Sequence, residues 1–467
     1  MKKEYLRKVI GTALVMAVMA SMTACSGAAA ADAAQTGRSA AAEETAAETA
    51  EETADISEEK AGDAALEETS QKTVSETAAD LSDYFTDRDM EQSADLTDAV
   101  IYEVKDGEDI TITEEGVYVL KGEAAEVTVI VEADDEAKVQ LVLDGVTVTN
   151  TDAPVIYVKS ADKVFVTTTD SENSLSVSGS FTADGDTNTD AVIFSKDDLV
   201  MNGTGTLNIS SSDNGISSKD ALKITGGTLN VTSSADALEA NDGIYVADGA
   251  VTIDSGKDGF HAGDSDDTTI GDIYIAGGTI KVNAADDGIQ GTTVVRIAGG
   301  TIDVAAAEGI EGTDVEIGGG TITIQASDDG INASAKSSAC PVTLVINGGS
   351  LTVSMAAGDT DALDSNGSLY INGGTVDISA QFAFDYVTDG AINGGTVTVN
   401  GSQVTQLSNS MMGGGGMRGG MQGGAPAEGG MMGGMKGHGG MPKGGRPSEN
   451  SREGSQEGSL EGTEETF

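Results

Sequence analysis

A repeat of about 21 residues runs through the chain from about residue 190 onward. Two phrases mark each copy. The first is Gly-Gly-Thr or Gly-Gly-Ser before alternating apolar residues, at positions 226, 277, 299, 319, 348, 373 and 394, with a degenerate copy at 248. The second is acid-Gly-apolar-polar, seen as "DGFH" at 258, "DGIQ" at 287, "EGIE" at 308 and "DGIN" at 329, with variants at 214, 236, 361 and 382. So short a unit, rich in β-branched residues, excludes the helical solenoids.

Each repeat is predicted to form one coil of three short strands. In one copy these strands are 215–217, 222–224 and 229–231. Alternate side chains of a strand point to the same side, so one core would contain Ile216, Leu222, Ile224, Leu229 and Val231. Stacked coils hydrogen-bond to their neighbours. The sequence therefore predicts an all-β, three-sided parallel β-helix over residues 81–407.

The two ends of the chain have a different composition. Residues 1–24 combine a basic start with a short apolar run, which predicts an export signal. The signal ends in Met-Thr-Ala-Cys, typical of a bacterial lipobox in which Cys25 is lipidated; an ordinary signal peptide followed by a chance cysteine is the alternative. Residues 25–80 are predicted to be a disordered acidic tether and 408–467 a disordered Gly/Met-rich tail, for which Cu(I) binding is a weaker alternative. We therefore expect an exported, monomeric lipoprotein at the outer face of the bacterial cytoplasmic membrane or in the cell wall.

The charge of the chain limits its partners. The formal net charge is −52, which excludes a nucleic-acid binder because phosphates require lysine and arginine. It also disfavours anionic membrane surfaces, so the lipid anchor would be the sole membrane contact. With Cys25 lipidated, Cys340 has no intrachain partner and no disulfide is expected.

In a β-helix the acid of each coil stacks on the acid of the next at about 4.8 Å. The predicted acid column contains Asp236, Asp258, Asp287, Glu308, Asp329 and Asp361, with Asp286 and Asp328 beside it. Two residues past the glycine, or past its substitute, lies a polar column of Ser217, Glu239, His261, Gln290, Glu311, Asn332, Asp364 and Asp385. Like charges about 5 Å apart repel by roughly 0.8 kcal/mol per pair even in water. Calcium binds carboxylate oxygens at about 2.3–2.6 Å, so one ion could lie between neighbouring coils.

Calcium is accordingly the predicted cofactor. Its candidate ligands are Asp236, Glu239, Asp258, Asp286, Asp287, Glu308, Glu311, Asp328, Asp329, Asp361, Asp364 and Asp385. Candidate carbohydrate-binding residues are His261, Gln290 and Asn332. The alternative is a set of solvated Asp-Gly turns that hold no ion. Zinc is disfavoured because the mature body has a single histidine and a single cysteine that is not lipidated.

Two insertions follow the same strand of the coil, at 263–272 and 333–341. They lie three coils apart, or roughly 14 Å along the axis. One interpretation is that they wall a groove around Gln290 and Glu311 that would fit a few sugar units. The other is that both are decorative loops.

The central body resembles the calcium-binding, carbohydrate-binding β-helix domain family of clostridia and relatives, which itself resembles pectate-lyase-type polysaccharide lyases. The resemblance runs from "DYFTDRDMEQSADLTDA" through "KVQLVLDGVTVTNTDAPVIYVKSADKVFVTTT", "NGISSKDALKITGGTLNV" and "GDTDALDSNG" to "GGTVTVNG". It implies a right-handed three-sided β-helix, bound calcium, and binding to plant cell-wall polysaccharides such as cellulose or pectic acids. Ala237 and Ala362 depart from the usual glycine but leave the acids in place.

Three functions stay open at this point. The first is calcium-dependent binding of polysaccharide, and pectic or acidic glycans are favoured over cellulose because the chain has no tryptophan for stacking sugars. The second is a polysaccharide lyase that eliminates uronates with calcium and a basic residue, for which the candidates are Lys219, Lys196 and Lys257. The alternative is that each of these lysines has a structural role and pairs with a nearby acid. The third is a structural stalk or adhesin, and fold alone does not separate the three.

Overall fold

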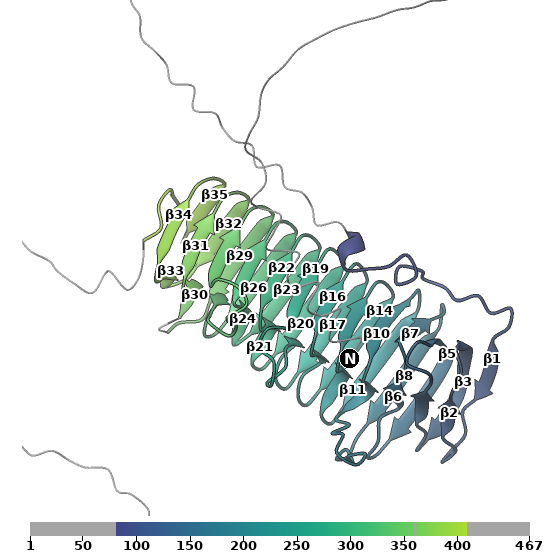
Figure 1. Cartoon of the computed structure of the whole chain (residues 1–467). Helices are drawn as coiled ribbons and strands as arrows, with labels where there is room; N and C mark the ends of the chain where they lie inside the picture. Colours follow the sequence, from purple (N-terminus) through teal and green to yellow (C-terminus); the bar gives the residue numbers. More distant parts are fainter. Residues whose placement is uncertain (1–80, 359, 409–467) are drawn as a thin grey trace, which may run out of the picture. The chain divides into compact units, whose positions relative to one another are not determined.

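The computed structural model describes residues 81–358 and 360–408, which form a parallel β-helix (Figure 1). Each coil gives one strand to each of three faces, and equivalent strands of successive coils pair in parallel. The predicted three-sided, all-β solenoid is thereby confirmed. In the described part of the chain the single helix is η1 (Leu81–Asp83), one 3₁₀ turn.

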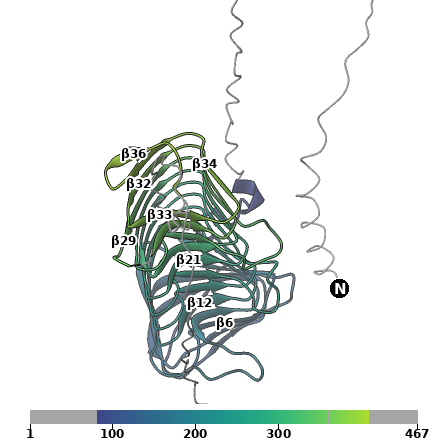
Figure 2. The same ribbon diagram turned by 90° about the vertical axis from the view of Figure 1, so that its left-hand side faces the viewer.

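Face 1 is a 12-stranded sheet that carries the acid-Gly phrases. Its strands are β2 (Ile110–Ile112), β4 (Val129–Glu132), β6 (Ile156–Ser160), β9 (Ala191–Ser195), β12 (Asn214–Ser218), β15 (Leu238–Ala240), β18 (Phe260–Ala262), β21 (Asp287–Gly291), β24 (Glu308–Gly312), β27 (Ile331–Ala333), β30 (Asp361–Ser365) and β33 (Phe382–Tyr386). Figure 2 shows β6, β12, β21 and β33 following one another along the axis.

Faces 2 and 3 are the two flanks of a 24-stranded sheet, because the long strands β3 (Gly116–Ala125) and β5 (Lys138–Asn150) pair along both. Face 2 adds β1 (Val100–Glu103), β7 (Lys163–Thr168), β10 (Asp198–Gly203), β13 (Ala221–Ile224), β16 (Gly243–Val246), β19 (Asp272–Ile275), β22 (Val294–Ile297), β25 (Asp314–Ile317), β28 (Thr343–Ile346), β31 (Ser368–Ile371) and β34 (Asp389–Ile392). Face 3 adds β8 (Glu172–Val177), β11 (Thr206–Ser211), β14 (Thr228–Ser233), β17 (Ala250–Ser255), β20 (Thr279–Ala284), β23 (Thr301–Ala306), β26 (Thr321–Ala326), β29 (Ser350–Met355), β32 (Thr375–Ser379), β35 (Thr396–Val399) and β36 (Ser402–Val404).

The core is built from the alternate residues of all three faces. The five residues predicted to share it in one coil, Ile216, Leu222, Ile224, Leu229 and Val231, are all buried. Equivalent residues stack in register from coil to coil, as Ile216 pairs with Leu238 and Leu238 with Phe260. The result is one continuous apolar cluster along the axis, which removes most of each coil's apolar surface from water.

Glycines permit the corners of each coil. The second glycine of the Gly-Gly phrase has a positive φ, for example 77° at Gly227 and 90° at Gly278, a conformation that side chains disfavour. The glycine after the acid has a different role. A Cβ at Gly259 would lie 2.4 Å from Val282 Cγ1 and 2.5 Å from a neighbouring carbonyl oxygen, so this corner lacks room for a side chain.

A segment ahead of the first strand crosses the outside of face 2. We call residues 84–99 the strap; in Figure 1 it runs from η1 towards β1. Its Tyr84 ring stacks on Tyr274 at 4.2 Å. Its Asp89 carboxylate is fully buried and forms ion pairs with Lys163 (3.0 Å) and Lys223 (3.3 Å). The repeat did not predict this contact.

Several predictions concern residues outside the described part of the chain. They are the export signal, lipidation of Cys25, the acidic tether over 25–80, and all but the first residue of the tail at 408–467. A search of the described residues for a helix long and apolar enough to cross a membrane found none.

Candidate functional site

The acids predicted to stack do lie on successive coils of face 1, where they form a backbone-to-side-chain ladder. The Asp258 N–H donates to Asp236 Oδ1 at 3.0 Å, and the Asp287 N–H donates to Asp258 Oδ1 at 3.0 Å. The ladder begins at Asn214 Oδ1, which accepts from the Asp236 N–H at 3.0 Å, and it recurs between the Asp361 N–H and Asp329 Oδ1 at 3.1 Å. One oxygen of each accepting carboxylate is thus engaged by backbone, which fixes the side chain and leaves its second oxygen for another partner.

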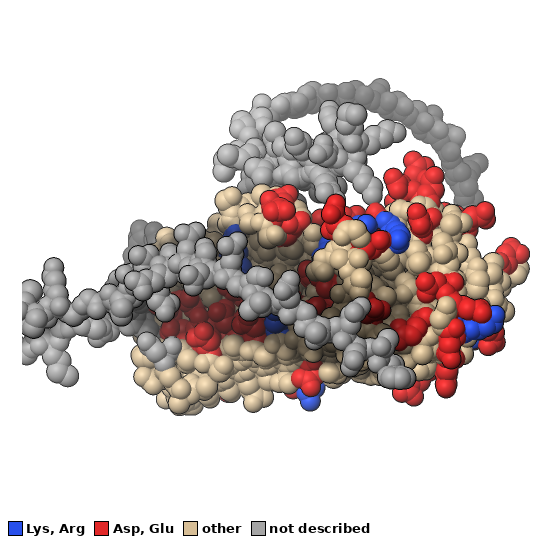
Figure 3. All heavy atoms as spheres, turned by 90° about the horizontal axis from the view of Figure 1, so that it is seen from below, with Lys and Arg blue, Asp and Glu red and all other residues tan. Residues whose placement is uncertain are grey.

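The polar column lies beside this ladder, in the register that the repeat predicts. Its members pair strand to strand: Ser217 with Glu239, Glu239 with His261, His261 with Gln290, Gln290 with Glu311, Glu311 with Asn332, Asn332 with Asp364, and Asp364 with Asp385. Seen from below, acidic side chains gather along a recessed band of the surface (Figure 3).

The two columns together bring ligand atoms within metal-binding reach. Three groups each place three such atoms within 4.8 Å of one another: Asp236, Asp258 and His261; Asp258, Asp286 and Asp287; and Asp287, Glu308 and Glu311. Asp286 is exposed, whereas Asp258 and Asp287 are buried. The groups share members, so they form one continuous stretch over four coils.

Burial and mutual repulsion perturb these carboxyl groups strongly. Burial, together with the negative charges of Asp258 and Glu311, raises the pKa of Asp287 to about 8. Burial, followed by the charge of Glu311, raises the pKa of Glu308 to about 7. Burial likewise raises the pKa of Asp329 to about 6 and of Asp364 to about 7. Ionised together, these groups require positive charge from elsewhere.

Calcium fits the residues present. The donors are almost all carboxylate and amide oxygens, the ligand types that calcium prefers. In addition, Asn332 is buried and its Oδ1 has no hydrogen-bond partner among the described residues, while its Nδ2 donates to Glu308 Oε2 at 3.1 Å. A buried amide oxygen without a partner is uncommon, and a cation between coils would satisfy it. The Asp385 Oδ1 atom is also buried, and no described residue forms a hydrogen bond with it.

The histidine end of the column differs chemically. His261 Nδ1 lies 2.7 Å from Asp258 Oδ2, and this hydrogen bond raises the pKa of His261 against the opposing effect of burial. A protonated imidazole would neutralise part of the charge at this end. Asp236 is also approached by Lys257, whose Nζ is 3.9 Å from its Oδ2. Because its ligand atoms are all carboxylate oxygens, the group of Asp287, Glu308 and Glu311 is the better candidate for calcium.

The residues assigned to carbohydrate are all bonded to acids. His261 contacts Asp258, the Gln290 amide contacts Asp287 and lies 3.2 Å from Glu311 Oε2, and Asn332 bonds Glu308. In these positions they orient the carboxylates.

The lysines considered for catalysis lie at one end of the columns. Lys219 follows β12 and lies 3.4 Å from Glu239 Oε1. The Glu239 carboxylate also accepts hydrogen bonds from Asn214 (3.0 Å) and Ser217 (2.8 Å). Lys196 lies one coil earlier, because Ser218 pairs with Ser195. Lys219 and Lys257 therefore act as counter-ions of the columns in this structure.

Sequence reasoning missed Lys336, which belongs to the second insertion. Its Nζ lies 2.5 Å from Glu311 Oε2, and Ser334 Oγ donates to Glu311 Oε1 at 2.9 Å. This insertion therefore reaches the polar column. The first insertion instead bonds to the preceding coil, where Asn241 Nδ2 donates to Asp264 Oδ2 at 2.9 Å. No repeat signal identifies Lys336, because insertions lie outside the period.

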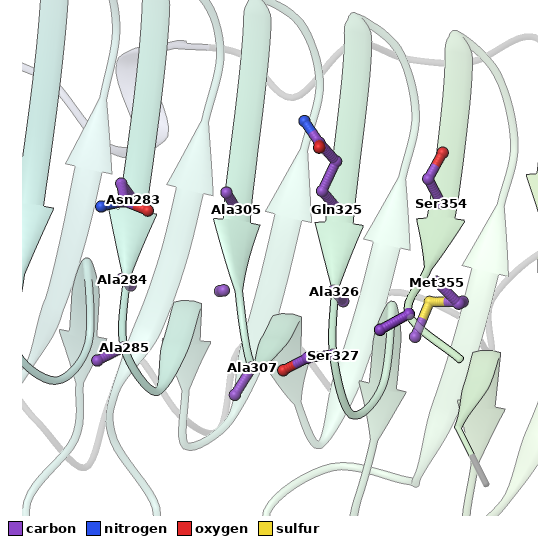
Figure 4. Close-up of a pocket in the computed structure, with 12 residues that line it drawn as sticks. Asn283, Ala284, Ala285, Ala305, Ala307, Gln325, Ala326, Ser327, Ser354 and Met355 are labelled. Carbon is purple, nitrogen blue, oxygen red and sulfur yellow. The ribbon is translucent and has the colours of Figure 1, made fainter. Parts of the chain in front are cut away.

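A groove lies along the corner between faces 3 and 1, next to the acid column (Figure 4). Its volume is about 530 Å³. It is lined by Asn283, Ala284, Ala285, Ala305, Ala306, Ala307, Gln325, Ala326, Ser327, Ser354, Met355 and Ala356. Small side chains at the corner create the hollow, and Asn283, Gln325 and Ser354 offer polar groups along one side. Ala285, Ala307 and Ser327 each lie one or two residues before an acid of the column.

Comparison with known proteins identifies the family. Residues 106–381, more than half the chain, match the family described as carbohydrate-binding domain-containing protein. A protein of that description from Acetivibrio thermocellus is 34% identical over 122 residues, which span 25% of this chain and 43% of the relative. A solved structure, described as the polysaccharide lyase-like protein from C. thermocellum in a gadolinium derivative, is 22% identical. It covers 66% of this chain and 99% of its own, with a TM-score of 0.36. By the extent of the family match, this chain is a member of the carbohydrate-binding domain-containing protein family.

Proposed function

We propose that this protein binds acidic plant cell-wall polysaccharide, such as pectic glycans, through calcium held by the columns of face 1. The observation that carries the proposal is the group formed by the buried Asp287 and Glu311 and the half-buried Glu308, whose ligand atoms lie within 4.8 Å of one another. Family membership supports a carbohydrate as the ligand.

The charge of the chain supports the calcium requirement. A polyuronate would be repelled by a protein of net charge −52. Calcium could bridge the carboxylates of the protein and those of the sugar, since it accepts six to eight oxygen ligands. Asp287, Glu308 and Glu311 each bring one ligand atom into the group, so positions would remain for the glycan.

The groove beside the acid column gives the glycan a place to lie. Its volume of about 530 Å³ lies within the usual range for ligand sites. The amide groups of Asn283 and Gln325 would donate hydrogen bonds to hydroxyl or carboxyl oxygens of the sugar. Because the groove follows the axis, it would suit a linear chain.

The test is binding of the purified protein to polygalacturonate in calcium and in excess chelator, for the wild type and two Asp→Asn variants. Asp287→Asn lies in the column, and Asp303→Asn changes an exposed acid on face 3. We expect binding in calcium only, lost in Asp287→Asn and retained in Asp303→Asn. Equal binding in chelator, or equal loss in both variants, would refute the proposal.

The same assay addresses a lyase. Elimination of uronate leaves an unsaturated product with ultraviolet absorbance, so a rising signal would identify catalysis. The lysines of the columns support binding over elimination, because Lys219 lies 3.4 Å from the Glu239 carboxylate and is already paired there. A signal that rises with time in calcium would make Lys219 the first residue to substitute.

We further propose that the protein is displayed at the cell surface, tethered by residues 25–80 from a lipid on Cys25. The lipobox-like sequence before Cys25 supports this. Metabolic labelling with a clickable fatty acid, lost in Cys25→Ser, would test it.

A further inference from the structure

The second insertion carries a lysine onto the centre of the columns. Lys336 lies three residues past the end of β27, and its side chain reaches Glu311 of β24, where its Nζ lies 2.5 Å from Glu311 Oε2. The two side chains are 29% and 8% exposed. Ser334 Oγ donates a hydrogen bond to the other carboxylate oxygen of Glu311 at 2.9 Å, so two residues of one loop contact the same carboxylate.

Glu311 belongs to the group best suited to a divalent cation. Its carboxylate lies within 4.8 Å of ligand atoms of Asp287 and Glu308. The oxygen that Lys336 contacts, Oε2, also lies 3.2 Å from Gln290 Nε2. Lys336 thus binds one oxygen of a carboxylate that a cation shared among these acids would also use.

An ammonium and a divalent cation cannot both bind this oxygen well. Calcium binds carboxylate oxygen at about 2.3–2.6 Å, nearly the distance at which Lys336 lies, so the two positive charges would be close together in a half-buried site. The lysine has a flexible stem on an insertion loop and can swing away. The carboxylates of Asp287 and Glu308 are instead held by hydrogen bonds from Gln290 and Asn332 of the strands.

We propose that Lys336 is a displaceable counter-ion: a divalent cation takes Glu311 from it, and the released ammonium then binds a carboxylate of the acidic glycan. This inference rests on the function proposed above and adds a residue that determines specificity. Binding of the cation then strengthens binding of the glycan, because it frees Lys336 from Glu311. Binding of the glycan strengthens binding of the cation, because it holds Lys336 away from Glu311. It also places one of the chain's few cations where an anionic sugar would arrive.

The test compares Lys336→Met, Lys336→Arg and the control Lys281→Met in the full chain. Lys281 is exposed on face 3, so its substitution makes the same charge change away from the columns. Calorimetry measures calcium affinity first, and then affinity for oligogalacturonate in saturating calcium.

We expect Lys336→Met to bind calcium about tenfold more tightly and oligogalacturonate about tenfold more weakly than the wild type. Lys336→Arg keeps the positive charge, and Lys281→Met lies away from the columns, so each variant should keep both affinities within about twofold. A coupling between two sites typically changes an affinity by more than that. A loss of folding in Lys336→Met would show in circular dichroism and would weaken both affinities, which also contradicts the inference.

Two failures are distinguishable. A wild type that binds no calcium overturns the proposed function itself. A wild type that binds calcium, with Lys336→Met unchanged or weaker in calcium affinity, overturns the role of Lys336 alone. Tighter calcium binding with unchanged glycan affinity overturns its contact with the sugar.

Discussion

Two regions of the molecule bury carboxylates in opposite ways. Asp89 of the strap is fully buried, and burial alone would raise its pKa; the hydrogen bond from Thr86 and the charges of Lys223 and Lys163 outweigh burial and lower the pKa. Asp287 of the acid column is also buried, but its neighbours are other acids, and its pKa rises to about 8. The chain therefore can neutralise a buried acid with its own lysines. It does so where it fastens the strap, and it leaves Asp287 among negative charges on face 1.

The largest effect on stability is expected from removing Asp89, the carboxylate of the strap that lysines neutralise. Asp89→Ala leaves Lys163 and Lys223 without the carboxylate that both contact, and removing one partner of a buried ion pair costs about 3–5 kcal/mol. We expect the strap to detach while the coils stay folded, because the coil strands pair independently of it. Hydrogen exchange should show lost protection at residues 84–92 and unchanged protection in β21 and β24. A uniform loss of protection along all coils would contradict this separation.

The pH dependence of the two regions should have opposite signs. Asp89 has a lowered pKa, so its contribution is fully present above its unfolded value near 4 and is lost as pH falls through its folded pKa. Asp287 and Glu308 have raised pKa values, so the folded protein binds more protons than the unfolded protein between about pH 4 and 8. In chelator, the stability of the coils around β21 should therefore fall as pH rises through this range.

Denaturant unfolding at several pH values, with and without calcium, measures this contrast. Calcium should flatten the slope between about pH 4 and 8, because it replaces protons as the counter-charge. The acid-induced release of the strap should be the same in calcium and in chelator. A calcium-sensitive strap transition would remove the distinction between the two regions.

The smallest effect is expected at Asn332. Asn332→Ala loses the bond from Nδ2 to Glu308, worth about 1 kcal/mol, but removes an oxygen that has no hydrogen bond among the described residues. We expect stability in chelator to change little and calcium affinity to fall severalfold. Thermal unfolding in the two conditions and a calcium titration measure this. Equal destabilisation in both conditions would show that Asn332 is structural only.

The repeat was sufficient to predict the coils and the two columns. Because one period sets the register, Asp236, Asp258 and Asp287 had to lie on successive coils once the β-helix was recognised. Even the coil with Ala237 in place of glycine keeps its acid in the ladder, since Asp236 still accepts from the next coil at 3.0 Å.

The contacts that lie outside the period could not be predicted. Asp89 and Lys163 are separated by 74 residues and share no motif. Lys336 lies in an insertion whose path depends on its own sequence rather than on the repeat. The hydrogen bonds from His261, Gln290 and Asn332 to acids depend on side-chain rotamers, which periodicity does not specify.

The most direct test of a cation site on face 1 is a calcium titration of the wild-type protein in weak buffer at pH 7, recording heat and released protons together. Because burial and neighbouring charges raise the pKa of Asp287 to about 8 and of Glu308 to about 7, Asp287 is mostly protonated and Glu308 about half protonated at that pH. We predict saturable calcium binding with proton release, reduced in Asp287→Asn. Binding without proton release, or no saturable binding, would contradict a cation site at these carboxylates.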